Sequence, residues 1–271
     1  MERRSKDVKF FDVLRYANEL DTLPWSHDNL VFLDEVSADN RDCWRTHGYG
    51  EPGQPLLVKG DYRRLPRVSM LCFINVHGVV ETVYTEGTFN KRTFAEACKM
   101  FASSGKVSQM PGRNSIWVLD GARIHCDPDL MRWLRGCGIG VVFLPAYSPF
   151  YNPIEIFFSI FKRRLRKVLL GHNQRKITAK TLPDKVLRII LDYHRYSMRP
   201  FFTHCGYITP GFFDWQKAYA REVTKDASAM AARQAQAQER EARAVIRQAE
   251  QRAITYERVK RRGGLQVNVG I

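Results

Sequence analysis

The sequence predicts an α/β domain in which helices flank a mixed five-stranded sheet, followed by a long C-terminal helix. Short apolar runs rich in β-branched residues alternate with segments whose apolar residues recur at helical spacing. Three strands come first, and helices then alternate with two further strands. The chain of 271 residues, 44% of them hydrophobic, is long enough to bury the core that such a domain needs.

The elements can be assigned in order along the chain. The first strand begins at Leu30, and two β-rich runs on either side of His77 and Gly78 predict an antiparallel pair. In chain order, the expected elements are a strand from Leu30, strands over 68–76 and 79–84, a helix over 91–102, a strand over 116–119, a helix over 128–134, a strand over 141–144 and a helix over 153–170. This order is that of the ribonuclease-H-like fold.

We expect three parts along the chain. Residues 1–29 carry enough large apolar side chains for one linker helix, residues 30–210 form the main domain, and residues 211–271 form a helical extension. The extension has no Gly or Pro between Phe212 and Gly263 and is rich in Ala, Gln, Glu and Arg. Its apolar positions do not keep a heptad, which favours a solvated or loosely self-associating helix over a strong coiled coil.

The formal net charge of +15 indicates a polyanionic partner, with nucleic acid as the first choice and a membrane surface as the competing one. No run of 18 apolar residues is present and the N-terminus lacks the apolar core of a secretory signal, so we expect an intracellular protein without a membrane span. The six cysteines form no CxxC pair, which favours reduced thiols over a zinc site.

Three carboxylates lie where the predicted elements begin or end. Asp34 and Asp120 each follow an apolar strand, and Glu155 opens the helix after the last strand. If the first and fourth strands are neighbours, both aspartates end at one sheet edge and the helix aims Glu155 at the same point. Such carboxylates repel one another unless hard cations neutralise them, which predicts two Mg²⁺ or Mn²⁺ ions and in-line displacement at a phosphodiester.

Each of these residues also has a purely structural interpretation. An aspartate at the end of a strand is often only a turn former. Asn152, Pro153 and Glu155 make a good helix start, in which Glu155 would reach back to the cap in a capping box. The order of the three carboxylates on the expected elements favours the catalytic interpretation.

The flanking sequence carries a resemblance to a known family. Its motifs are Phe-Leu-Asp-Glu at 32–35, Leu-Asp-Gly-Ala-Arg-Ile-His at 119–125 and Leu-Pro-Ala-Tyr-Ser-Pro-Phe-Tyr-Asn-Pro-Ile-Glu at 144–155. These resemble the DDE superfamily endonuclease domain of Tc1/mariner and IS630-type transposases, in the subgroup with 34 residues between the last two carboxylates. The resemblance extends over about Leu30 to Leu170 and implies that Asp34, Asp120 and Glu155 form the metal-binding catalytic triad.

The resemblance has consequences for nearby residues. Many relatives have Asn where this chain has Gly121, which removes a side chain near the metals. Glu35 is familiar from relatives, but neighbouring strand residues face opposite ways, so we expect it off the metals. We expect His125 and Asn152 beside the site, where His125 either orients a water or phosphate or is a turn histidine with local hydrogen bonds.

The helix after Pro153 has two faces. Its apolar positions are Ile154, Phe157, Phe158, Phe161, Leu165 and Val168. On another face, Glu155 continues into a basic track in which Lys162 and Arg166, helped by Arg163, Arg164 and Lys167, are expected to hold DNA phosphates. The alternative is a solvated charged face, and the same run also has the composition of a nuclear import signal.

These features predict a transposase-type DNA phosphoryl transferase that cleaves and joins DNA, with transposon ends and target DNA as partners and with possible homodimers. The resemblance implies an N-terminal pair of helix-turn-helix modules; only residues 1–29 precede the first strand, so we expect a truncated or domesticated copy, nuclear if eukaryotic. The alternatives are a non-catalytic DNA-binding or oligomerisation protein derived from a transposase, and a ribonuclease H or junction-resolving nuclease on the same fold.

Overall fold

The computed structural model describes residues 8–39, 67–170, 178 and 180–222, together with scattered helical positions between 228 and 247. The elements, in chain order, are α1 (Phe10–Asp21), β1 (Leu30–Ala38), β2 (Val68–Asn75), β3 (Gly78–Glu86), α2 (Lys91–Ala102), β4 (Ile116–Leu119), α3 (Pro128–Gly136), β5 (Gly140–Phe143), η2 (Pro149–Tyr151), α4 (Pro153–Leu170), α5 (Thr181–Leu191), α6 (Arg199–His204), β6 (Tyr207–Thr209) and β7 (Phe212–Phe213).

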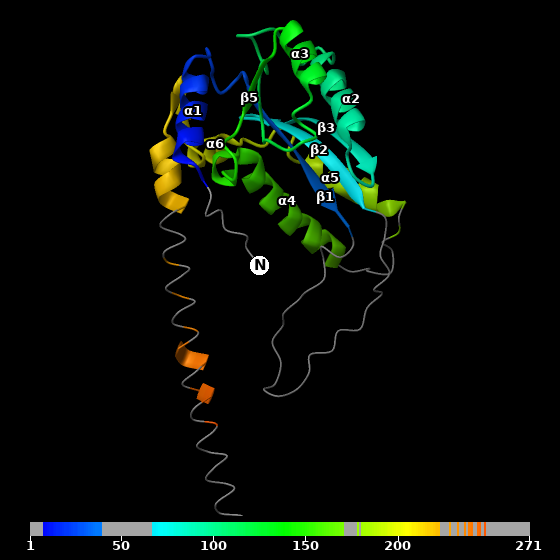
Figure 1. Ribbon diagram of the computed structural model, residues 1–271. Coiled ribbons are helices and arrows are strands. Elements are labelled where there is room, and N and C mark those ends of the chain that lie inside the picture. The colour runs from blue at the N-terminus through cyan, green and yellow to red at the C-terminus, as the bar shows by residue number, and fades with distance from the viewer. Residues whose placement is uncertain are drawn as a thin grey trace, which may run out of the picture. The chain divides into compact units, whose positions relative to one another are not determined.

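Strands β1 to β5 form one mixed sheet in the order β3-β2-β1-β4-β5 (Figure 1). The pairs β1–β2 and β2–β3 are antiparallel, whereas β1–β4 and β4–β5 are parallel. The predicted five-stranded mixed sheet is confirmed. The first and fourth strands are neighbours, which is the condition under which Asp34 and Asp120 were expected at one sheet edge. This strand order places the carboxyl ends of β1 and β4 next to each other.

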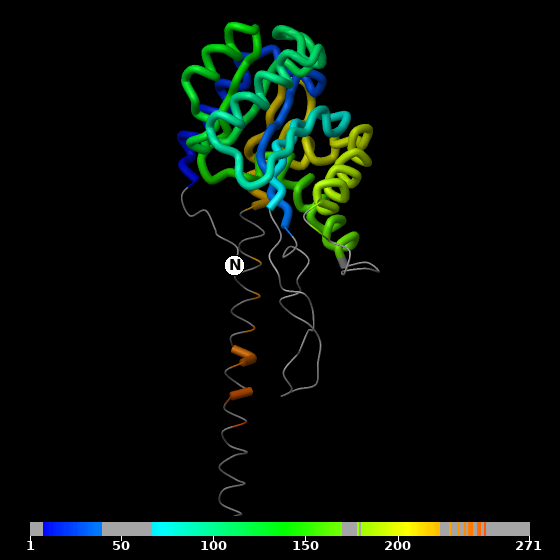
Figure 2. The backbone as a smooth tube through the Cα atoms, turned by 90° about the vertical axis from the view of Figure 1, so that its right-hand side faces the viewer, coloured from blue at the N-terminus to red at the C-terminus, as the bar shows by residue number. Residues whose placement is uncertain are grey.

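Helices cover both faces of the sheet. Side chains alternate along β1, so that Phe32 packs into the core on one face and Leu33 into the core on the other. Helices α2 and α3 pack on the Leu33 face, and α1, α4, α5 and α6 supply the core on the Phe32 face. Figure 2 shows α3 in green and α5 in yellow-green on opposite sides of the sheet.

Burial of one face fixes the rotation of α4 about its axis. Ile154, Phe157, Phe161 and Leu165 are fully buried, and burial of each such side chain contributes roughly 1.5–3 kcal/mol. Val168 was expected in this apolar face but is 40% exposed, and Leu169 is buried instead. Both positions lie near the same side of a 3.6-residue repeat, and the packing of the neighbouring elements selects Leu169. The buried face leaves Glu155 and the basic residues on the exposed side of α4.

The segments that flank the sheet in sequence also pack on its core. Contacts divide the chain into two compact units, residues 1–218 and 219–271. The expected N-terminal helix is α1, and its Tyr16 hydroxyl lies 2.7 Å from the hydroxyl of Tyr207 in β6. Residues 215–222 are helical, and the expected long tail helix beyond them lies largely outside the described residues.

Two further expectations concern the thiols and the membrane. Cys72, Cys98 and Cys205 are buried, Cys137 is half-buried, Cys126 is exposed, and Cys43 lies outside the described residues. None of the helices in the described part of the chain is long and apolar enough to span a membrane.

Candidate active site

Asp34 and Asp120 are brought side by side by the parallel pairing of β1 with β4. Phe32 pairs with Val118, and two further steps along both chains bring Asp34 opposite Asp120. Strand β4 ends at Leu119, so both carboxylates lie just beyond the last paired residues of β4. The expectation that β1 ends at Asp34 was wrong, because β1 continues to Ala38 along β2, where Asp34 pairs with Cys72.

Glu155 lies in the first turn of α4, close to the ends of β1 and β4. The structure disfavours the capping box at this helix start, because the backbone N–H of Asn152 donates to the carbonyl of Pro149 at 2.9 Å. That N–H is the donor a capping box would need. The buried Asn152 side chain accepts a long hydrogen bond of 3.4 Å from the Ile154 N–H and so caps the helix itself. The Glu155 carboxylate is therefore left to face the pocket.

Asp34, Asp120 and Glu155 line one pocket of about 400 Å³. The rest of its wall comes from the turn after β4 and from the loop between β5 and α4, and consists of Gly121, Ala122, Leu144, Pro145, Ala146, Tyr147, Ser148, Pro149 and Asn152. The structure thus brings the three carboxylates and Asn152 together in one pocket. Their metal-binding role stays a prediction.

The pocket is electrostatically strained because it gathers negative charge. Burial, together with the charges of Asp120 and Glu155, raises the pKa of Asp34 to about 8, although the backbone N–H of Glu35 donates to its Oδ1 at 2.7 Å. Burial also raises the pKa of Glu155; the charge of Lys162 opposes this rise and that of Asp120 adds to it. The charged form of Asp34 is costly until a cation enters the pocket.

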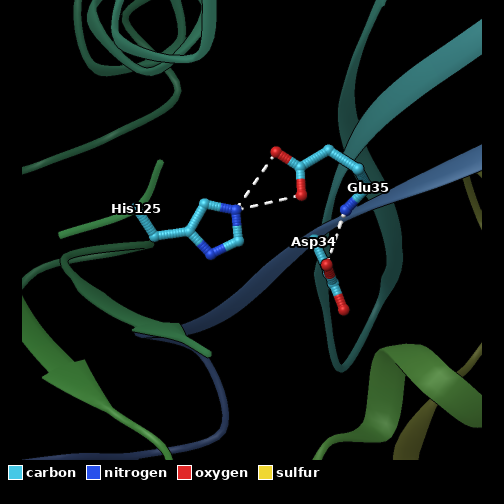
Figure 3. Close-up of side chains that lie close together, drawn as sticks. All are labelled: Asp34, Glu35 and His125. Carbon is cyan, nitrogen blue, oxygen red and sulfur yellow. Dashed lines mark hydrogen bonds and ion pairs between the residues drawn. The ribbon is translucent and has the colours of Figure 1, made fainter. Parts of the chain in front are cut away.

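His125 links Asp120 to Glu35 beneath the pocket. Its Nε2 lies 2.9 Å and 3.1 Å from the two carboxylate oxygens of Glu35, and its Nδ1 is hydrogen-bonded to Oδ1 of Asp120. The ring is 1% exposed and stacks on Phe94 of α2, with centroids 4.4 Å apart. Figure 3 shows the Glu35 carboxylate facing the ring while the Asp34 carboxylate points away from it. An imidazole that is hydrogen-bonded through both of its ring nitrogens in this way fixes the orientation of the Asp120 carboxylate.

The two carboxylates keep His125 protonated. Burial alone would lower the pKa of His125, but the hydrogen bonds and charges of Asp120 and Glu35 raise it to about 10. In the same way, burial alone would raise the pKa of Asp120, yet the hydrogen bond and charge of His125 hold it below its ordinary value. At neutral pH the imidazolium therefore donates to both carboxylates, and Asp120 is ionised.

Sequence reasoning missed the part that Glu35 plays. Asp34, Glu35 and His125 each offer a ligand atom, and these atoms all lie within 4.8 Å of one another. The Asp34 and Glu35 carboxylates face different ways, as expected for neighbouring strand residues, but strand alternation does not tell that His125 lies on the Glu35 side (Figure 3). The spacing of five residues between Asp120 and His125 was a signal for the first half of this network, and no local pattern pointed to the second half.

The basic track expected on α4 is exposed to solvent. Lys162, Arg163, Arg166 and Lys167 are all exposed, and Lys162 is close enough to Glu155 to act on its pKa. Arg164, which lies among them in the sequence, pairs with Asp192 at 2.5 Å and lies over the Tyr193 ring. The track therefore runs from the acidic pocket along one exposed side of α4, and its contact with DNA stays a prediction.

Gly121 forms part of the pocket wall directly after Asp120. A Cβ at this position would meet no atom within 4 Å. The surroundings of Gly121 therefore leave room for a Cβ, so crowding at this atom does not require a glycine here.

Comparison with models of known protein families shows to which family the chain belongs. A family model described as DDE superfamily endonuclease matches residues 29–177, which is more than half of the chain and includes all three carboxylates. The chain belongs to the DDE superfamily endonuclease family. The resemblance drawn from the three sequence motifs is thereby confirmed.

Solved structures support the fold of this DDE endonuclease domain. The chain is similar to that in the crystal structure of a pre-cleavage Mos1 transpososome, with 15% identity over 82% of this chain and a TM-score of 0.56. It is also similar to that in a Mos1 mariner paired end complex with Mn, with 17% identity over 82% of this chain and a TM-score of 0.53. These likenesses confirm the ribonuclease-H-like fold. The chain spans 65% of the length of each solved chain, and no curated protein matches it.

Proposed function

We propose that this DDE endonuclease domain is a transposase-type DNA phosphoryl transferase that cleaves DNA and transfers strands in a metal-dependent reaction. The observation that carries the proposal is the convergence of Asp34, Asp120 and Glu155 in one pocket at the carboxyl edge of the sheet. The motifs around these residues resemble Tc1/mariner transposases, and the fold is that of Mos1, whose solved complexes are described as transpososome and paired-end complexes.

The donor set fits two Mg²⁺ or Mn²⁺ ions. Carboxylate oxygens are the ligands that these hard cations prefer. A cation in the pocket would also offset the repulsion between the Asp34 carboxylate and those of Asp120 and Glu155. When bound, such ions would supply Lewis-acid chemistry that favours in-line displacement at a phosphodiester by a water or a DNA 3′-hydroxyl. Asp34, Asp120 and Glu155 would hold the ions, since their carboxylates line one pocket.

The remaining residues orient the reaction. His125 and Glu35 hold the Asp120 carboxylate in one rotamer, because the imidazolium donates to both acids. Lys162 and Arg166, on the side of α4 that begins with Glu155, would bind phosphates on either side of the reacting one. The attacking oxygen then forms a new bond to phosphorus while the bond to the leaving oxygen breaks on the opposite side.

The partners follow from the same proposal. The DNA would be transposon ends and target DNA, and the paired-end description of the Mos1 complex favours a homodimer. The basic surface and a DNA substrate favour a nuclear location in a eukaryotic cell.

The decisive experiment is nicking of supercoiled plasmid by the purified protein with Mn²⁺ or Mg²⁺. We expect nicking by the wild type, none in chelator, and a fall of several orders of magnitude in Asp120→Asn, because the amide keeps the shape of the side chain but removes its charge from the metal site. The rate of conversion to open circles measures the effect.

The matched control is Asp129→Asn, at an exposed aspartate on α3 that pairs with Arg132. It should nick like the wild type. Equal nicking by wild type and Asp120→Asn, or none by the wild type while the protein still binds DNA, would favour the non-catalytic DNA-binding interpretation instead.

The basic track gives a separate prediction about affinity. Reversal of two charges, Lys162→Glu with Arg166→Glu, should weaken non-specific DNA binding. It should also reduce the slope of log affinity against log salt by about 2, since each lost phosphate contact removes about one unit. Fluorescence anisotropy with a labelled duplex at several salt concentrations measures both quantities.

The control for net charge is Arg92→Glu with Arg132→Glu. These exposed arginines lie on α2 and α3, which pack on the other face of the sheet, and each pairs with an acid on its own helix. The control should leave the salt slope nearly unchanged. If the slope of log affinity against log salt changed equally in both double variants, only the overall charge of the protein would matter. The basic track would then be a solvated charged face without specific phosphate contacts.

A further inference from the structure

The loop between β5 and α4 presents one aromatic ring at the rim of the acidic pocket. Tyr147 is 65% exposed and lines the same pocket as Asp34, Asp120 and Glu155. Among the exposed aromatic side chains that the structure describes, it is the one that lines this pocket. In the described part of the chain it makes no hydrogen bond, ion pair or ring contact, so its ring is available to a ligand.

The backbone holds Tyr147 in a conformation that a side chain rarely adopts. Its φ is +58°, in the left-handed region, where a Cβ crowds the neighbouring carbonyl. Residues other than glycine that stay in this region outside a helix end are held there by their surroundings, and they cluster at functional sites.

The surroundings that impose this conformation are on both sides of Tyr147. Pro145 and Pro149 restrict the backbone before and after it. The buried Ser148 donates from its hydroxyl to the carbonyl of Ala146 at 3.2 Å, and its own carbonyl accepts from the Tyr151 N–H at 3.1 Å. Tyr151 is in turn fully buried, and the Tyr207 hydroxyl donates to its carbonyl at 3.0 Å. The ring is therefore presented from a rigid base.

The pocket wall combines two kinds of chemistry. The wall includes three carboxylates, which together with cations suit a phosphate, and the loop from Leu144 to Asn152, which is mostly apolar apart from Ser148, Asn152 and the Tyr147 hydroxyl. The neutral, flat part of a nucleotide is its base, and every base offers a face on which an aromatic ring can stack. A base that is paired inside a duplex has both faces covered, so only an unpaired or displaced base can use this ring.

We propose that Tyr147 binds an unpaired nucleobase adjacent to the reacting phosphate by stacking, and so positions that phosphate over the carboxylates. This inference rests on the proposed function and adds a substrate contact to it. Tyr147 then favours DNA whose strands are separated at the reaction site, with little preference for base identity, because stacking tolerates every base.

Photocrosslinking tests the contact without catalysis. A single-stranded oligonucleotide that carries 5-iodouracil is irradiated with the protein, and the crosslinked peptide is identified by mass spectrometry. We expect a crosslink at Tyr147 in the wild type and also in the Asp120→Asn variant, and its loss in Tyr147→Ala. A pattern of crosslinks that does not include Tyr147, or that is unchanged in Tyr147→Ala, overturns the proposal.

Nicking rates separate a stacking ring from a residue that only shapes the loop. Stacking on an aromatic residue predicts a loss of about 5- to 150-fold in Tyr147→Ala and retention in Tyr147→Phe. Tyr147→Gly relieves the positive φ but lacks a ring, so it should lose as much as Tyr147→Ala. Wild-type nicking by Tyr147→Gly would assign only a backbone role to the residue and overturn the inference. Absence of nicking by the wild type would instead count against the proposed function, and the crosslink would then decide the inference alone.

Discussion

Replacing Asp34 by asparagine should make the metal-free protein more stable above neutral pH while it removes metal-dependent nicking. The folded protein raises the pKa of Asp34 to about 8 from an ordinary value of 3.8. Between these values the unfolded chain has released the proton that the folded chain retains, so the free energy of unfolding falls as pH rises through this window. One pKa unit corresponds to about 1.4 kcal/mol, and allowance for partial solvent exposure leaves a few kcal/mol. Asparagine has no proton to lose and therefore lacks this contribution to the slope.

Urea unfolding in chelator at several values between about pH 5 and about pH 8 measures this difference. Glu155 and His125 also have raised pKa values, so a residual slope is expected in Asp34→Asn, and the difference between the two proteins isolates Asp34. Addition of Mn²⁺ should stabilise the wild type more than Asp34→Asn. Asp129→Asn, which lies outside the pocket, should behave as the wild type. Identical pH slopes in wild type and Asp34→Asn would show that the pocket does not strain this carboxylate.

The second large effect is expected at His125. His125→Ala removes the buried imidazolium between Asp120 and Glu35, whose side chains are 45% and 19% exposed. Because the two carboxylates stay in contact with solvent, we expect a loss of about 1–3 kcal/mol, the usual cost of leaving a hydrogen-bonding group without its partner. The same change frees the Asp120 carboxylate to rotate. Residues that orient a metal ligand typically contribute about 10- to 100-fold to metal affinity or activity, so we expect a fall of that size in the nicking rate. Chemical denaturation and plasmid nicking measure the two effects.

Glu35→Gln separates orientation from charge at the same position. Its amide oxygen can still accept from His125 Nε2, so the nicking rate should fall less than in His125→Ala, whereas Glu35→Ala should approach His125→Ala. Because both residues act through Asp120, the double variant of His125→Ala and Glu35→Ala should be little worse than His125→Ala alone. Additive losses would mean that Glu35 acts independently of His125.

The histidine control is His77→Ala. His77 is paired with Asp28 at 2.8 Å, but both side chains are largely exposed. Exposed pairs contribute about 0–1 kcal/mol, so this variant should keep nearly full stability and nicking. A comparable loss in both variants would indicate a general effect of removing a surface or loop histidine rather than the bridging role of His125.

The sequence by itself determined the order of strands and helices along the chain and placed the three carboxylates on them. Apolar runs and helical spacing placed Asp34, Asp120 and Glu155 at the ends of elements, and parallel neighbouring strands must end at the same edge of a sheet. The register of Phe32 with Val118 then follows the expected arrangement. The strands and helices could be predicted because hydrophobic periodicity is a local property that can be read directly from the sequence.

Only the tertiary structure decided how the carboxylates are held. It continues β1 past Asp34 because β2 supplies hydrogen-bond partners there, and it brings His125 within 2.9 Å of Glu35, 90 residues away in the chain. In the tertiary structure the Asn152 N–H donates to the carbonyl of Pro149, so that Glu155 is not needed as a capping partner. The backbone of Tyr147 adopts the left-handed conformation. The contact of His125 with Glu35 joins segments that are distant in the chain, and the conformations at Asn152 and Tyr147 depend on hydrogen bonds within an irregular loop. Neither kind of contact leaves a periodic trace in the sequence.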